Sequence, residues 1–154
     1  MHDTLNIFNH FLGDRVGEGQ GRRRALLTDR GATTYDEVFV ASGRFARLLQ
    51  EAGIGPGDRV LIALPDGEDY VAALFGILRL GAVAVMVNPQ LPVEQIRYFL
   101  TYTEPKTALI TSSVEAPFTE AISSITAECA LMVTGTPEFK DQISVLNPDV
   151  PAYS

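Results

Sequence analysis

The chain has 154 residues, of which 46% are hydrophobic and 20% charged, and its net charge at neutral pH is −7. This length and composition are typical of one globular domain with a sizeable core, and they exclude a disordered chain. The negative charge argues against nucleic acid or an anionic membrane as the main partner, and the single cysteine excludes an intrachain disulfide, which favours a reducing, cytoplasmic location.

The first 23 residues are expected to form an irregular lead-in segment. One short helix is predicted within it, because three bulky apolar side chains recur at helical spacing: Phe8, Phe11 and Leu12. Three closely spaced glycines, at positions 17, 19 and 21, then predict a flexible turn. Residues 25–35 predict a β-hairpin, since the turn signal Asp29-Arg30-Gly31 separates two short strand-like runs.

The clearest local signal is a long helix that begins after Thr34. Thr34 and Glu37 have the spacing of a capping box, in which each side chain bonds to the backbone of the other residue. Apolar residues then recur at helical spacing as far as Ala52. Gly53 is expected to end the helix, because glycine adopts the left-handed conformation at little cost.

Strands and helices alternate over residues 58–134, which predicts consecutive right-handed βαβ units and a mostly parallel sheet. The expected strands cover residues 59–64, 82–87, 107–111 and 130–133. The first strand is apolar on both faces, so helices are expected on both sides of the sheet. Asp66 is expected to cap the helix of residues 67–81, and Pro92 to open the next helix at its first position. A weaker helix is predicted over residues 117–125.

The predicted fold class is therefore α/β, with a mostly parallel sheet flanked by helices over residues 24–134, preceded by a short helix and a β-hairpin. Residues 135–154 are polar and contain prolines, which predicts a connector to further polypeptide. The chain is thus expected to be the front part of a larger protein. The longest apolar stretch, residues 70–87, is interrupted by Arg79 and Gly81 and does not qualify as a membrane span.

The glycine-rich stretch does not predict a dinucleotide-binding loop. That loop requires G-x-G-x-x-G directly after a strand, so that the backbone can approach the pyrophosphate. Here Gly17 and Gly19 are followed by Arg22 where the third glycine belongs, and no strand precedes them. The run Arg22-Arg23-Arg24 is interpreted as a solvated patch rather than an anion site.

Acidic residues follow the first long strand, at the end where open α/β sheets bind ligands. Asp66, Glu68 and Asp69 are compatible with a phosphoacceptor or magnesium site, but also with helix capping, since the helix dipole favours acids in a first turn. We favour capping, because no second acidic cluster follows another strand. Asn88-Pro89 ends the second strand and is interpreted as a loop signal.

No catalytic, cofactor-binding or metal-binding residue is assigned from these patterns. The histidines, His2 and His10, lack the partner residues of a metal site. Cys129 adjoins an apolar run and is expected to be a buried structural thiol. Four further side chains receive structural roles, the first two at solvent edges and the last two in packing: Arg79, Arg97, Tyr98 and Tyr102.

Several runs resemble the core motifs of adenylate-forming enzymes, which include acyl-CoA synthetases, luciferases and peptide-synthetase adenylation domains. Thr34-Tyr-Asp-Glu-Val38 and then Gly53-Ile-Gly-Pro-Gly-Asp-Arg-Val60 resemble the first core region. Leu78-Arg-Leu-Gly-Ala-Val83 and Val87-Asn-Pro-Gln-Leu-Pro92 resemble the second, and residues 92–100 and 106–111 are similar to the helix and strand that follow it. The opening Asn6-Ile-Phe-Asn-His-Phe-Leu12 is similar to the start of benzoate-type aryl-CoA ligases.

The resemblance implies an acid–thiol ligase as the full-length parent. In that family a carboxylate attacks the α-phosphate of ATP, and coenzyme A then displaces AMP to give a thioester. ATP, Mg²⁺ and coenzyme A are implied as cofactors of the parent, and none is expected in this fragment. The implied partners are the remainder of the parent enzyme and a small aromatic or other carboxylic acid. The resemblance leaves open which acid is activated, whether the acceptor is coenzyme A or a carrier-protein thiol, and whether the protein forms a homodimer.

The family's Ser/Thr/Gly-rich phosphate loop is missing from the sequence, and Asp149-Val-Pro-Ala-Tyr153 resembles the run just before that loop. No family catalytic residue is therefore carried onto any position, and the fragment alone is expected to be inactive. The alternative is an independent, non-catalytic, flavodoxin-like interaction module.

Overall fold

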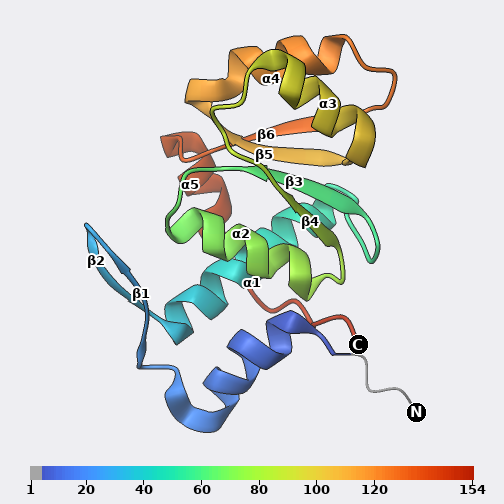
Figure 1. Ribbon diagram of the computed structural model, residues 1–154. Coiled ribbons are helices and arrows are strands. Elements are labelled where there is room, and N and C mark those ends of the chain that lie inside the picture. Colours follow the sequence, from blue (N-terminus) through green and yellow to red (C-terminus); the bar gives the residue numbers. More distant parts are fainter. Residues whose placement is uncertain (1–4) are drawn as a thin grey trace.

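Four parallel strands form the central sheet in a computed structural model, which describes residues 5–154 (Figure 1). The strands are β3 (Arg59–Ala63), β4 (Val83–Met86), β5 (Thr107–Thr111) and β6 (Ala130–Thr134), and their order across the sheet is β4-β3-β5-β6. All three strand pairs are parallel. The α/β class and the parallel sheet are thus confirmed.

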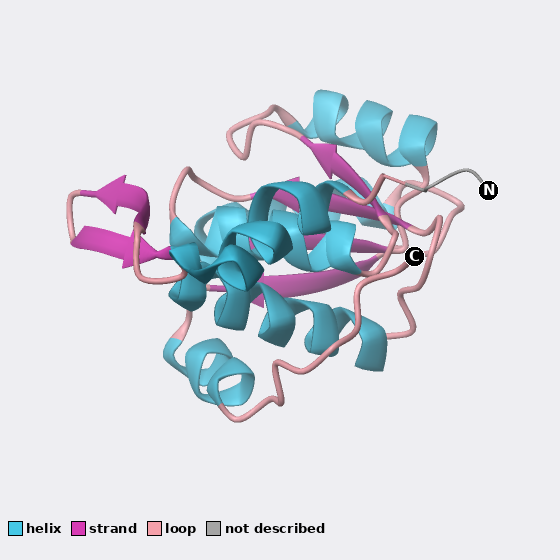
Figure 2. Cartoon of the chain, turned by 90° about the horizontal axis from the view of Figure 1, so that it is seen from below, coloured by secondary structure: helices cyan, strands magenta, loops and turns pink. Residues whose placement is uncertain are grey.

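Helices cover both faces of this sheet, as the apolar character of β3 predicts (Figures 1 and 2). One face carries α1 (Tyr35–Glu51), α2 (Glu68–Arg79) and α5 (Pro137–Ser144); the other carries α3 (Val93–Thr103) and α4 (Glu115–Ser123), after the short turn η3 (Ser112–Val114). The residues of β3 alternate between the two cores. Val60 and Ile62 pack toward α1 and α2, whereas Leu61 and Ala63 pack toward α3 and α4.

The N-terminal segment packs outside α1 and α2 as a further layer. It comprises two wide helical turns, η1 (Asn9–Gly13) and η2 (Val16–Gln20), and its buried side chains are Phe8 and Leu12. The expectation that Phe11 shares their buried face is wrong, because Phe11 is 60% exposed. Hydrogen bonds of the i to i+5 type widen the turn, so residues four apart share a face and the residue three apart does not.

The predicted hairpin and the capped helix are confirmed. Strands β1 (Arg24–Thr28) and β2 (Gly31–Thr34) pair antiparallel. At the start of α1, the Glu37 amide donates to Thr34 Oγ1 at 3.3 Å, and the Thr34 amide donates to Glu37 Oε2 at 2.7 Å. Gly53 has φ of 82° just beyond the helix, in the left-handed region that favours glycine.

Two sequence expectations at element ends are wrong, and so is the expectation that the apolar run of residues 82–87 forms a buried strand. Asp66 does not cap α2, because Gly67 stands at the N-cap position without a side-chain cap. Pro92 is itself the N-cap of α3, since its ψ of 151° is extended, and the helix begins at Val93. Strand β4 is not buried, because it lies at the edge of the sheet and exposes Val83 and Met86 by 47% and 57%.

Residues 135–154 include the helix α5. The Phe139 amide donates to Thr136 Oγ1 at 3.1 Å and caps α5, whose first position is Pro137. Phe139 and Val150 are buried in the core that α1 and α2 share with the sheet. The boundaries at residues 23 and 134 stay a prediction. Within residues 5–154, no helix is long and apolar enough to cross a membrane.

Candidate functional site

The carboxyl ends of the four strands form the candidate functional site. The strand that begins the sheet, β3, lies beside β4 on one side and β5 on the other, so the chain reverses its direction of winding between β3 and β5. Open α/β sheets bind ligands outside the carboxyl ends of the strands at such a point. Two neighbouring hollows lie at this edge, and they share the wall Leu64-Pro65-Asp66.

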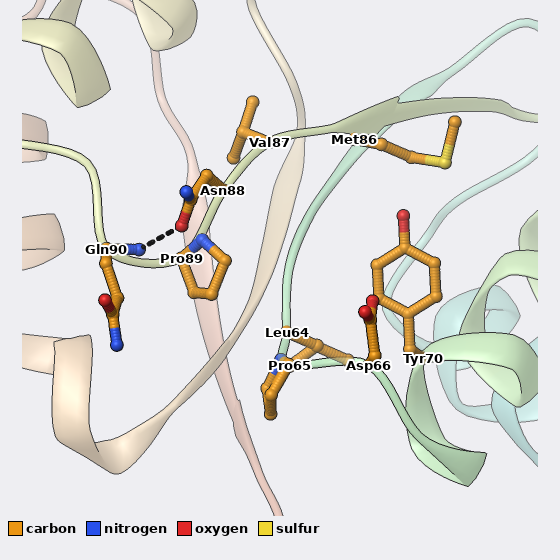
Figure 3. A pocket seen from close by; sticks show the side chains of 9 residues that line it. All are labelled: Leu64, Pro65, Asp66, Tyr70, Met86, Val87, Asn88, Pro89 and Gln90. Carbon is orange, nitrogen blue, oxygen red and sulfur yellow. Dashed lines mark hydrogen bonds between the residues drawn. The ribbon is translucent and has the colours of Figure 1, made fainter.

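The first hollow, of about 510 Å³, opens between the ends of β3 and β4 (Figure 3). Its lining residues are Leu64, Pro65, Asp66, Tyr70, Met86, Val87, Asn88, Pro89 and Gln90. Asp66 is the one charged residue among these nine. The Gln90 amide donates to Asn88 Oδ1 at 2.9 Å, so the side chain of Asn88 stabilises its own turn, as the loop interpretation expects. Because Asp66 is the only charged lining residue, an anionic ligand would meet a carboxylate in the first hollow and no cation.

The second hollow, of about 450 Å³, lies where β3, β5 and β6 end, beneath the tip of the β1–β2 hairpin. Its charged lining residues are four acids and two bases: Asp29, Asp66, Glu68, Asp69, Arg30 and Lys140. Burial raises the pKa of the Asp69 carboxyl, and repulsion from Glu68 adds to this increase; Lys140 and Arg30 lower it only in part. Carboxylates outnumber cations in this hollow by four to two.

The three acidic residues that follow β3 in the sequence, Asp66, Glu68 and Asp69, all line the second hollow. Two of them have the role in the first helical turn that the sequence predicts. Glu68 and Asp69 lie in the first turn of α2, where the helix dipole favours negative charge. The Thr33 hydroxyl donates to Glu68 Oε1 at 2.6 Å and ties the hairpin to this helix. Among residues 5–154, no three His, Cys, Asp or Glu side chains are grouped as metal ligands. Lys140 and Arg30 were missed, because only the packing of α5 and the hairpin brings them to this edge.

The remaining candidates lie away from the strand ends. The glycines at 17 and 19 belong to η2 and do not connect a strand to a helix. The His10 ring packs edge-on against Phe11, with centroids 4.8 Å apart, and His2 lies outside the described residues. Cys129 is half-buried, and burial raises the pKa of its thiol to about 11, so the nucleophilic thiolate is scarce at neutral pH.

The arginines and tyrosines on the helices follow the sequence expectations only in part. Arg97 lies at a solvent edge, where its Nη1 pairs with Glu94 Oε2 at 2.6 Å. Tyr98 and Tyr102 pack against each other, but on the surface: their rings are nearly parallel, and the residues are 61% and 76% exposed. Arg79 does not lie at a solvent edge, because it is only 5% exposed. Its position in the last turn of α2 gave no local signal of burial.

Comparisons with known proteins find relatives over nearly the whole chain. A family described as AMP-binding enzyme matches residues 13–150. A 3-hydroxybenzoate--CoA/4-hydroxybenzoate--CoA ligase of Thauera aromatica is 35% identical over 97 residues, which cover 63% of this chain and 18% of that ligase. A benzoate--CoA ligase of Thauera aromatica is 26% identical over 134 residues, which cover 86% of this chain and 25% of that ligase.

Solved structures agree with these matches. The crystal structure of a benzoate CoA ligase from Burkholderia xenovorans LB400 superposes with a TM-score of 0.82 at 28% sequence identity, and the match covers 97% of this chain and 30% of that chain. This chain therefore spans less than a third of the length of each of these three relatives.

Proposed function

Because the chain belongs to the family of AMP-binding enzymes, we propose that it is the N-terminal scaffold of an ATP-dependent aryl- or acyl-CoA ligase. The family match confirms the resemblance to adenylate-forming enzymes, and the fold is that of their N-terminal subdomain. The proposed parent reaction joins a carboxylate to AMP with release of pyrophosphate, and then transfers the acyl group to coenzyme A. An aromatic acid as substrate, coenzyme A as acceptor and a cytoplasmic location belong to the same proposal.

The charge at the strand ends is the observation that supports a scaffold role for this chain. A triphosphate requires cations or backbone N–H donors that face it. The second hollow instead offers four carboxylates against Arg30 and Lys140, and the first hollow offers Asp66 alone. The described residues therefore do not fit the phosphates of ATP or coenzyme A by themselves. In this proposal the chain supports a site that other parts of the ligase complete.

The exposed sheet edge also favours a scaffold over an independent interaction module. A self-sufficient domain normally protects its outer strands with charges, prolines or covering segments. Strand β4 carries none of these residues and exposes Val83 and Met86. Further large apolar side chains are at least 60% exposed: Leu5, Phe11, Leu27, Tyr98, Tyr102 and Val145. We expect the isolated chain to bind a hydrophobic dye, whereas an independent module would stay dye-free and monomeric.

A chimera tests the scaffold role directly. Residues 5–154 would replace the matched segment of the Burkholderia xenovorans benzoate CoA ligase, with the unmodified ligase as the matched control. We expect the chimera to form benzoyl-CoA with the acid preference of its host, and the 154-residue chain alone to show neither ATP binding by calorimetry nor benzoate-dependent ATP–pyrophosphate exchange. Either activity in the isolated chain would overturn the proposal, as would a folded chimera that prefers a different acid.

A further inference from the structure

The C-terminal residues Asn147–Tyr153, here called the strap, are docked on α1 and α2 as an extended segment (Figure 1). We propose that the strap and the N-terminal segment, residues 6–20, form one cooperative unit that docks and detaches together, with Arg79 as its latch. This inference stands on the contacts of this chain alone and does not depend on the proposed function.

The strap is recognised through its main chain. Arg47 Nη2 donates to the Asp149 carbonyl at 3.0 Å, and Arg79 Nε donates to the Val150 carbonyl. In return, the Tyr153 amide donates to the Arg79 carbonyl at 2.8 Å. The two bonds from the arginine side chains are charge-assisted and therefore stronger than neutral hydrogen bonds. Val150 is 2% exposed and inserts its side chain into the core beneath the strap.

Two glycines form the seat on which the strap lies. A Cβ atom at Gly43 of α1 would stand 2.1 Å from the Pro148 carbonyl oxygen. A Cβ atom at Gly81, just beyond α2, would stand 2.5 Å from the Tyr153 ring, and Gly81 also has φ of +69°. Both distances are far shorter than real Cβ contacts, so any larger residue at either position displaces the strap.

Arg79 also contacts the N-terminal segment, and this double contact makes it a latch. Its guanidinium carbon lies 4.8 Å from the centroid of the Phe8 ring, within the range of a cation–π interaction. Asn6 Nδ2 donates to the Tyr153 carbonyl at 2.7 Å, and Ala152 packs against the cluster that contains Phe8. Loss of the N-terminal segment would hydrate Arg79 and weaken its hold on the strap. Loss of the strap would remove the Asn6 bond, so each segment stabilises the other.

Amide hydrogen exchange on the complete chain tests this coupling, because it measures local opening. The Tyr153 amide reports on the strap, since its bond to Arg79 forms only on docking; the His10 amide, bonded to the Asn6 carbonyl, reports on the N-terminal segment. In Arg79→Met we expect both amides to exchange roughly tenfold faster or more, with the amides of β3 unchanged.

Gly43→Ala is the second variant, because its methyl group would stand 2.1 Å from the Pro148 carbonyl oxygen and 2.9 Å from Arg79 Nη1, and so displaces the strap and Arg79 without direct contact with residues 6–20. We expect the His10 amide to accelerate in this variant by the same factor as the Tyr153 amide. Arg97→Met is the matched control, since it removes a helical arginine that bonds to Glu94 and Ser124, and it should leave both amides unchanged.

Three outcomes would overturn the proposal. Faster exchange of Tyr153 with unchanged His10 in Gly43→Ala would show that the segments open independently. Unchanged exchange of both amides in Arg79→Met would exclude the latch. An equal acceleration of the β3 amides would show global destabilisation rather than local detachment.

Discussion

Replacing Gly76 by alanine should destabilise the fold, although alanine is the better helix former. Gly76 lies in α2 where this helix crosses α1. An added Cβ would stand 2.9 Å from the Ser42 carbonyl oxygen, 3.0 Å from the Ala46 amide nitrogen and 2.9 Å from Phe45 Cβ. Backbone atoms cannot move away by a change of rotamer. The two helices must therefore separate.

The size of the loss follows from two opposing effects. Ordinary contact begins near 3.4 Å, so the helices must move apart by about 0.5 Å (3.4 − 2.9). A gap of that size forfeits at least a quarter of the dispersion energy of the loosened contacts. Overpacking of this kind costs about 1–3 kcal/mol, and the higher helix propensity of alanine returns about 1 kcal/mol. We expect a net loss of up to about 2 kcal/mol in the free energy of unfolding.

Urea denaturation measures this change as a lower midpoint with an unchanged m-value. Gly17→Ala is the matched control, because nothing lies within 4 Å of a Cβ added there. That variant should be as stable as the wild type or slightly more stable. If Gly76→Ala proves at least as stable as the wild type, the close crossing of α1 and α2 is refuted.

Two further predictions concern hydrogen-bonded ends of elements. Thr34→Ala removes the acceptor of the Glu37 amide and should lower the free energy of unfolding by about 1 kcal/mol, measured by thermal or urea unfolding. Thr34→Ser keeps a hydroxyl acceptor and should retain most of this stability. An equal loss in both variants would exclude the cap as the cause. The hydrogen bond from Lys106, followed by that from the Gly55 amide, lowers the pKa of Asp58. Its stabilising effect is thus present above its unfolded pKa of about 3.9 and is lost as the pH falls through the folded pKa. Asp58→Asn should be less stable than the wild type at neutral pH and equally stable in strong acid; a difference that persists in strong acid would refute this reading.

The secondary structure was predictable from the sequence because its signals are local. The bonds between Thr34 and Glu37 join residues three apart, and the hairpin turn at residues 29–31 joins neighbouring strands. The run of residues 59–64 is apolar on both faces, which predicts a covered parallel strand wherever it lies in the sheet. The resemblance to adenylate-forming enzymes also follows from short runs of sequence, and the family match confirms it.

Contacts between distant parts of the chain carry no such signal. The burial of Arg79 depends on Val150, 71 residues away, and on the Phe8 ring. The exposure of β4 depends on strand order, since the same apolar run would be buried in the middle of the sheet. Likewise, the second hollow combines Lys140 with Asp69 only because α5 returns to the strand ends.

For this protein, residue order therefore specifies the helices, the strands, their parallel arrangement and the family. Packing specifies which strand is outermost, which arginine is buried and which charges face the hollow. The physical reason is range: caps, turns and periodicity act over a few residues, whereas burial and electrostatic environment are set by whichever segments the folded chain brings into contact.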